Sequence, residues 1–269
     1  MEINDIELTN EKVTLFITLY AKSLDYQSKR PILNDKTAND IMNSLNYDFS
    51  KYKGFGGNVS VIRTKQIDDW TNEFIKINKN AIVLNLGCGL DARVNRINAQ
   101  SSIAWYDIDF PEVIKLRKNY YINNKSNYFT IETSISDENW YKNIRNDLPT
   151  IIVADGVFEY LTSDEIKKLF DCLTKHFIKG EIIFDVMNTF AGNMGKKGLK
   201  ESTGAQHKWL VDDTREIDNY SEKIKRINDI SVFNLPCIKN IRIGTKIFCK
   251  MAFLIKKYRN MLRLLRYEF

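Results

Sequence analysis

Five short apolar runs between residues 81 and 186 constrain the fold of this chain more than any other feature. Each is four or five residues long, and amphipathic segments separate them. Runs that are apolar on both faces are typical of parallel strands covered by helices. Strands are expected at residues 81–84, 103–106, 128–131, 151–154 and 182–186, and helices at residues 111–122, 138–146 and 163–179. The sequence therefore predicts an α/β fold that binds its ligand at the carboxyl ends of the strands.

The opening part of the chain has no strand pattern. Apolar residues recur there at steps of three and four, as in Val13, Phe16 and Tyr20. This spacing predicts helices over residues 9–78. No linker, low-complexity tract or fixed repeat separates this block from the strands, so we expect one domain.

The end of the chain carries most of the net charge of +6. Residues 239–269 contain nine basic residues and one acid, which leaves 31 basic and 33 acidic residues in residues 1–238. A nearly neutral body argues against nucleic acid as a partner. Apolar and basic residues alternate from Lys246 to Arg266, which permits two interpretations. We expect a helix and a final antiparallel edge strand that complete the sheet, and the alternative is a basic amphipathic segment that contacts an anionic membrane or an acidic partner.

Cysteine and histidine usage limits the chemistry. Four cysteines lie far apart without a Cys-x-x-Cys pair, and only two histidines are present, which predicts neither a disulfide framework nor a metal site. Acids near the start and the lack of a long uncharged apolar stretch predict no export signal and no membrane-spanning helix. We therefore expect a cytoplasmic protein.

The turn after the first predicted strand carries a nucleotide-binding signal. Gly87 and Gly89 stand between strand and helix, where a missing Cβ lets the backbone approach a ligand. Together with Ala92 they also fit the dinucleotide fingerprint, so this turn alone does not separate NAD from S-adenosylmethionine.

Two acids and an arginine extend this site. Asp107 and Asp109 end the second predicted strand, at the distance from the turn where a carboxylate reaches ribose hydroxyls, although Asp109 could instead cap the next helix. Arg63 precedes the first strand and could bind a ligand carboxylate or pair with an acid on its own helix. S-adenosylmethionine has such a carboxylate. We therefore favour it as the cofactor.

Four blocks of sequence are familiar when taken together. They are residues 63–69, 85–93, 107–111 and 154–162. In their order and spacing they resemble the leucine carboxyl methyltransferase family, and within it the bacterial polyketide O-methyltransferase branch, over about residues 18–213. The resemblance implies a Rossmann-like class I methyltransferase that uses S-adenosylmethionine, with a seven-stranded, mostly parallel sheet and helices on both faces. Residues 1–78 would form a helical cap, 79–188 the cofactor-binding core, and 189–269 a substrate-side insertion with the C-terminal helix and strands.

The resemblance also implies roles for single residues. Arg63 would hold the methionine carboxylate of the cofactor, Gly87 and Gly89 would lie against it, and Asp109 would bind the ribose hydroxyls. Asp155 stands where the family usually has Glu, and it would lie under the methionine end.

One block departs from the family pattern. Residues 134–137 match an Asp-Leu-Arg-Asp segment that contacts adenine, which makes Ser134 and Ile135 the adenine contacts here. Ser136 replaces an arginine that in the eukaryotic enzymes grips the carboxylate of a protein substrate, which argues against such a substrate. Tyr160 would face the methyl acceptor.

These features predict methyl transfer to a carboxyl or hydroxyl oxygen of a small molecule of polyketide type. A carboxylate is already ionised at neutral pH, whereas a hydroxyl needs a general base, for which His207 is the better of the two histidines. Lys22 would add positive charge from the cap. A protein carboxyl terminus as acceptor, and an NAD-binding oxidoreductase, are the alternatives.

Overall fold

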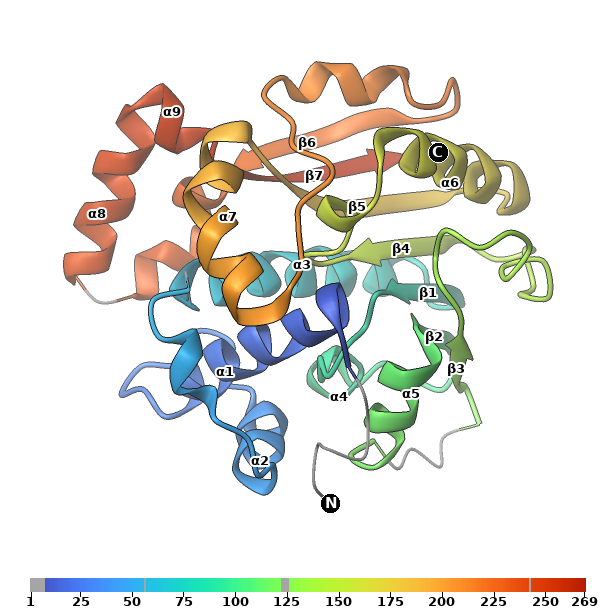
Figure 1. Cartoon of the computed structure of the whole chain (residues 1–269). Coiled ribbons are helices and arrows are strands. Elements are labelled where there is room, and N and C mark those ends of the chain that lie inside the picture. The colour runs from blue at the N-terminus through green and yellow to red at the C-terminus, as the bar shows by residue number, and fades with distance from the viewer. Residues whose placement is uncertain (1–7, 56, 122–125, 242) are drawn as a thin grey trace.

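One sheet of seven strands runs through the computed structural model, which describes residues 8–55, 57–121, 126–241 and 243–269 (Figure 1). The strands are β1 (Ala81–Leu86), β2 (Ile103–Asp109), β3 (Tyr128–Glu132), β4 (Thr150–Ala154), β5 (Gly180–Met187), β6 (Lys225–Ser231) and β7 (Leu262–Glu268). Their order is β3-β2-β1-β4-β5-β7-β6, and all neighbours are parallel except that β7 is antiparallel to both β5 and β6. The five predicted strands and the mostly parallel seven-stranded sheet are confirmed.

The C-terminal strand lies inside the sheet, so the prediction of a final edge strand is wrong about its position. Leu264 and Leu265 of β7 point to opposite faces and both are fully buried, because helices cover both faces here. The edge strand at this end of the sheet is β6, which the sequence analysis missed because polar residues such as Arg226, Asn228 and Asp229 interrupt its apolar pattern. A polar edge strand protects a sheet from pairing with other chains.

Helices fill both sides of the sheet and its carboxyl end. They are α1 (Leu15–Tyr26), α2 (Lys36–Ser44), α3 (Gly57–Ile77), α4 (Arg93–Ile97), α5 (Pro111–Lys118), α6 (Ser163–His176), α7 (Thr189–Thr203), α8 (Ile243–Leu254) and α9 (Lys256–Arg259). Short 3-10 helices are η2 (Asn10–Thr14), η3 (Phe49–Tyr52), η4 (Phe158–Tyr160), η5 (Thr214–Asn219), η6 (Val232–Asn234) and η7 (Pro236–Asn240). Among the described helices, none combines the length and the apolar character needed to cross a membrane.

The helix predicted at residues 138–146 is absent, and this prediction is wrong. The segment forms isolated turns instead. Asn139 adopts a left-handed backbone conformation with φ of 74°, which interrupts a right-handed helix. The indole N–H of Trp140 donates to the carbonyl of Ile135 at 3.2 Å and ties the turn to the loop after β3. By contrast, the helices predicted at 111–122 and 163–179 are present as α5 and α6 with shorter ends.

Alternate residues of the central strands pack on opposite faces of the sheet. In β1, Ile82 and Leu84 belong to the apolar cluster that includes α6, whereas Ala81 and Val83 belong to the cluster that includes α3. All four are fully buried. This explains why the strands read as continuous apolar runs in the sequence.

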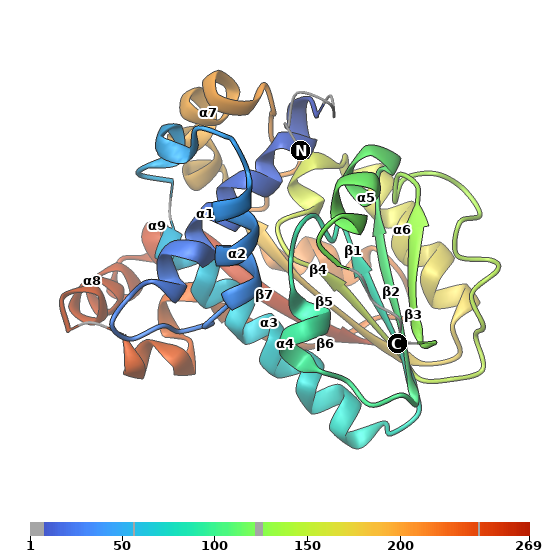
Figure 2. The same ribbon diagram turned by 90° about the horizontal axis from the view of Figure 1, so that it is seen from below.

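Helices α1 and α2 lie beyond the carboxyl ends of the strands, on the side of the molecule where α7 also lies, whereas α3 packs on a face of the sheet (Figure 2). Leu15 and Leu19 of α1 pack in one cluster with Leu90, from the turn after β1, and with Val113 and Leu116 of α5. Of the helices predicted before residue 78, α1 and α2 are thus joined by an apolar contact to the edge of the sheet where a ligand is expected.

Two glycine substitutions test the packing of the sheet. A Cβ on Gly180, at the start of β5, would lie 1.9 Å from the carbonyl oxygen of Thr150 on β4. Gly180→Ala should therefore lower the free energy of unfolding by roughly 1–3 kcal/mol. Gly195→Ala in α7, where a Cβ meets nothing within 4 Å, should raise it by up to about 1 kcal/mol, because alanine favours helix. Urea unfolding followed by circular dichroism measures both, and equal midpoints would contradict the close approach of β4 and β5.

Candidate functional site

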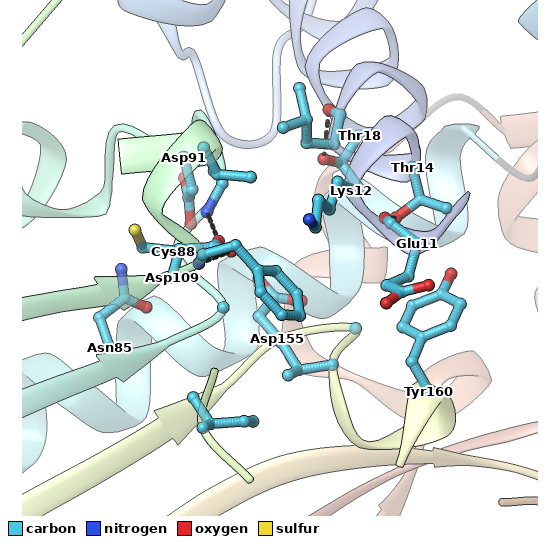
Figure 3. A pocket seen from close by; sticks show the side chains of 18 of the residues that line it. Glu11, Lys12, Thr14, Thr18, Asn85, Cys88, Asp91, Asp109, Asp155 and Tyr160 are labelled. Carbon is cyan, nitrogen blue, oxygen red and sulfur yellow. Dashed lines mark hydrogen bonds between the residues drawn. The ribbon is translucent and has the colours of Figure 1, made fainter. Parts of the chain in front are cut away.

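A cavity of about 280 Å³ opens between α1 and the carboxyl ends of the first four strands (Figure 3). Its walls come from the turns after β1, β2, β3 and β4 and from the N-terminal segment, which are far apart in the sequence. Of the predicted site residues, those on its lining are Arg63, Gly87, Gly89, Asp109, Ser134, Ile135, Asp155 and Tyr160. The structure therefore brings eight of the ten predicted residues together at one place.

The turn after β1 depends on its two glycines. Gly87 and Gly89 have φ of 57° and 48°, which side chains with a Cβ rarely adopt. A Cβ on Gly87 would also lie 2.6 Å from a methyl carbon of Val157, so this turn packs tightly on the loop after β4. Backbone geometry and packing both require glycine here.

Asp109 ends β2 with its carboxylate at the cavity. The backbone N–H groups of Gly89 and Phe110 each donate to it at 2.8 Å. Burial raises the pKa of Asp109 to about 6, although these N–H groups and Arg117 oppose the shift. At pH 7 the group is mostly ionised and can accept hydrogen bonds from ligand hydroxyls.

Asp107 is not on the cavity lining. Its carboxylate is fully buried and accepts hydrogen bonds from four donors: Asn85 at 2.8 Å, Trp105 at 2.9 Å, Tyr128 at 2.7 Å and Arg117 at 2.5 Å. All of its acceptor capacity is thus used inside the protein. The two acids of the predicted pair have different positions, and only Asp109 can touch a ligand.

Arg63 reaches from α3 to the cavity, where two acids fix it. Its Nε lies 2.7 Å from Asp155 and its Nη1 lies 2.8 Å from Asp185. Its Nη2 makes no hydrogen bond to any residue in the described part of the chain, and a Cβ on Gly156 would lie 2.6 Å from that atom. Gly156 therefore leaves room at the end of the guanidinium group, which keeps donors for a ligand carboxylate.

A buried chain of ion pairs links this arginine to the N-terminal helices. Asp155 also binds Arg93 at 2.7 Å, and Arg93 binds Asp68 of α3 at 2.7 Å. Asp91 lies 3.3 Å from Arg93 and 3.0 Å from Lys22 of α1. Burial alone would raise the pKa of Asp155, but the guanidinium groups beside it hold this pKa at about 2.

Four residues of this network, Asp68, Asp91, Arg93 and Asp185, received no role from the sequence. Asp91 and Arg93 follow the glycine turn, and Asp185 interrupts the apolar run at residues 182–186. The sequence did contain one signal: Asp185 is an acid within a strand predicted to be buried, and a buried charge needs a partner of opposite charge. That partner, Arg63, is 122 residues away in the chain.

The wall after β3 is neutral. Ser134, Ile135 and Ser136 line the cavity there, and the hydroxyl groups of the two serines lie 2.8 Å apart. This wall offers hydroxyl and apolar contacts where the family has charged residues.

Tyr160 stands at the other end of the cavity. Figure 3 shows it beside Glu11 and Thr14, away from Asp91 and Asp109. His207 is not on the lining, and its ring centre lies 5.7 Å from that of Tyr160. Burial lowers the pKa of His207, which keeps its imidazole neutral at pH 7.

Comparison with known proteins decides the family. The leucine carboxyl methyltransferase family matches residues 14–174. The chain belongs to this family. The tetracenomycin polyketide synthesis O-methyltransferase of Streptomyces glaucescens is 29% identical over 267 residues, with 98% of each chain covered. An S-adenosyl-L-methionine-dependent methyltransferase of Gibberella zeae is 29% identical and covers 82% of each chain.

Solved structures agree with the fold. A Thermobifida fusca protein named as a candidate methyltransferase has a TM-score of 0.58 at 10% identity and covers 92% of this chain and 93% of its own. The resemblance to the family and the class I methyltransferase fold are thereby confirmed. This member of the leucine carboxyl methyltransferase family is an S-adenosylmethionine-dependent methyltransferase.

The different positions of the two acids can be tested by stability. Asp107→Asn should lower the free energy of unfolding by about 3–5 kcal/mol, because it leaves the buried guanidinium of Arg117 without its charge partner. Asp147→Asn is the matched control, since it breaks an exposed ion pair with Arg145 and should cause no measurable change. Urea denaturation of both variants gives the comparison. An Asp107→Asn protein as stable as the control would contradict the structural role of Asp107.

Proposed function

We propose that this methyltransferase methylates a carboxyl or hydroxyl oxygen of a small molecule. The observation that carries the proposal is that a single cavity joins Arg63, Asp155 and Asp109 to a separate end formed by Tyr160. Such a cavity presents cofactor-binding groups along the glycine turn and a separate end where an acceptor would bind. The Streptomyces relative, named for polyketide synthesis, supports a small-molecule acceptor.

The charges around the cavity fit S-adenosylmethionine. When bound, this cofactor supplies an electrophilic methyl group on a positively charged sulfur. Arg63 would bind its carboxylate through Nη2, and Asp155, ionised because of its low pKa, would lie near its amino group. Asp109 would accept hydrogen bonds from the ribose hydroxyls, and Ser134 and Ile135 would contact the adenine. The chain's own part in the reaction is then to align the acceptor oxygen with the methyl group.

We favour a carboxylate acceptor over a hydroxyl. A hydroxyl acceptor requires a base within hydrogen-bond reach, and His207 is not on the cavity lining. Burial raises the pKa of Tyr160, so its phenol group is protonated at neutral pH and can donate a hydrogen bond. Lys208 also lies on the lining, together with Lys12 and the acids Glu11 and Glu165, so this end carries both signs of charge. A carboxylate acceptor is already ionised at neutral pH, so neither Tyr160 nor Lys208 has to remove a proton from it.

Two alternatives follow from the same site. The family name includes a carboxyl methyltransferase, so a protein carboxyl terminus is the second candidate acceptor. Ser136 speaks against it, because it stands in place of the arginine that, in the eukaryotic enzymes the sequence resembles, grips the carboxylate of a protein substrate. An NAD-dependent oxidation is the third candidate, and cofactor binding tests it directly.

Calorimetric titration with S-adenosylmethionine, S-adenosylhomocysteine and NAD tests the cofactor site. We expect micromolar binding of the first two and none of NAD. Arg63→Ala and Asp109→Asn should each weaken binding by about thirtyfold or more, the value of a lost charge-assisted contact. Affinity should also fall as the pH drops below about 6, because protonation of Asp109 removes an acceptor, and Asp109→Asn should abolish this pH dependence.

The control variant is Lys65→Ala on α3, whose partly exposed ion pair with Asp69 lies outside the cavity lining. It should bind both ligands as the wild type does. Binding of NAD alone, or wild-type affinity in the Arg63 and Asp109 variants, would refute the proposed site. Thermal unfolding of each variant separates lost binding from lost folding.

Product chemistry tests the acceptor. Incubation with methyl-labelled S-adenosylmethionine and a panel of aromatic acids and phenols should give a base-labile methyl ester, which releases labelled methanol in alkali. We expect rates that stay constant between about pH 6.5 and 8.5 and change less than about threefold in His207→Gln, since no base is required. A base-stable ether together with a hundredfold loss in His207→Gln would show a hydroxyl acceptor instead.

A further inference from the structure

The helix α8 leaves most of its apolar side chains in solvent. The exposed residues are Ile243, Ile247, Phe248, Met251, Leu254 and Ile255, with exposed fractions between 52% and 79%. Only Cys249 and Ala252 of this helix are buried against the body of the protein. We call these six exposed residues the apolar face of α8. In Figures 1 and 2, α8 stands at the outer edge of the molecule, away from α5 and α6.

The apolar face is continuous. At 100° per residue, the first five of its members fall within an arc of about 140° on the helix, and Ile255 follows directly at the helix end. Cys249 and Ala252 lie outside that arc, so the helix rests on the protein by one side and presents the apolar side outward. The sequence analysis expected this segment to complete the sheet, and β7 does so, but α8 contributes little to the core.

Positive charge borders the apolar face. Lys246 and Lys250 are one turn apart on α8, outside the apolar arc, and Lys256 and Lys257 begin α9. Residues 239–261 contain seven Lys or Arg and no Asp or Glu. A helix with an exposed apolar side beside a row of lysines has the composition of helices that lie in the plane of an anionic bilayer surface.

We propose that α8 and the start of α9 bind the surface of a membrane that contains anionic lipids. The apolar face enters the boundary between headgroups and acyl chains, and the exposed Lys250 and Lys256 contact the lipid phosphates. Charge decides against a second copy of this chain, because the same cations would face each other across a symmetric contact. The proposal does not depend on the acceptor proposed above.

A second hollow lies next to this face and favours lipid. Phe248 lines it together with Leu24 of α1 and Phe55, and its volume is about 610 Å³. This hollow extends the apolar surface inward from the helix, where the end of an acyl chain can enter. It shares no lining residue with the methyl-transfer cavity, which lies on the other side of α1. Binding to membranes can therefore be measured without disturbing the cofactor site.

Co-sedimentation of the full-length protein with phosphatidylcholine vesicles, with and without about one third phosphatidylglycerol, tests the proposal. We expect binding to the anionic vesicles only, with loss at high salt. Ile247→Asp/Met251→Asp should abolish it. Lys250→Glu/Lys256→Glu should weaken it by about twentyfold or more, from about fivefold for each cation.

Matched controls carry the same changes elsewhere. Ile77→Asp/Ile178→Asp alters two isoleucines that are 78% and 63% exposed on other surfaces, and Lys167→Glu/Lys197→Glu makes the same change in net charge. Both should bind vesicles as the wild type does. All variants should retain the wild-type affinity for S-adenosylhomocysteine, which confirms that they fold.

Three results would overturn the proposal. The first is that the wild-type protein stays in the supernatant with anionic vesicles. The second is that the α8 variants and their controls bind vesicles equally well. The third is that analytical ultracentrifugation shows a dimer, which Ile247→Asp/Met251→Asp dissociates. The last result would assign the apolar face to a second copy of the chain.

Discussion

A buried network of ion pairs holds the cavity, the sheet and the N-terminal helices in one arrangement. Asp155 at the end of β4 binds Arg63 from α3 and Arg93 from α4, and Asp91 connects Arg93 to Lys22 on α1. Removing one partner would leave an uncompensated charge in the interior, at a cost of about 3–5 kcal/mol. Helices that are separate in the sequence are thereby held at defined positions around the carboxyl edge of the sheet.

The same network prepares the site for its ligand. Because Asp155 is kept ionised by its guanidinium neighbours and Arg63 is fixed by two acids, these charges are already oriented toward the cavity. A site that is oriented in advance needs little rearrangement when it binds a charged cofactor. Two glycines also shape the site. Gly87 lets the backbone of the turn approach the cavity closely, and Gly156 leaves space for the guanidinium group of Arg63.

Local patterns in the sequence predicted well wherever the local signal was strong. The apolar runs predicted β1, β2, β4 and β5 because a strand covered on both faces has no polar side, and β3 was predicted although it lies at an edge and is partly exposed. The helix expected at residues 138–146 failed because Asn139 prefers a left-handed turn, and β6 was missed because an edge strand can be polar. From the sequence we expected α8 to pack on the sheet, but its apolar face is exposed. The period of apolar residues predicts an amphipathic helix, and it does not tell what covers the apolar face.

The sequence by itself determined the first five strands, the N-terminal helices, the glycine turn and, through its motifs, the family and cofactor. Only the tertiary structure decided that Asp109 faces the cavity while Asp107 serves the core, that His207 lies behind Tyr160, and that Arg63 pairs with Asp185. The reason is physical: strand and helix patterns arise from neighbours in the chain, whereas the environment of a charged side chain arises from distant segments that meet only when the protein folds.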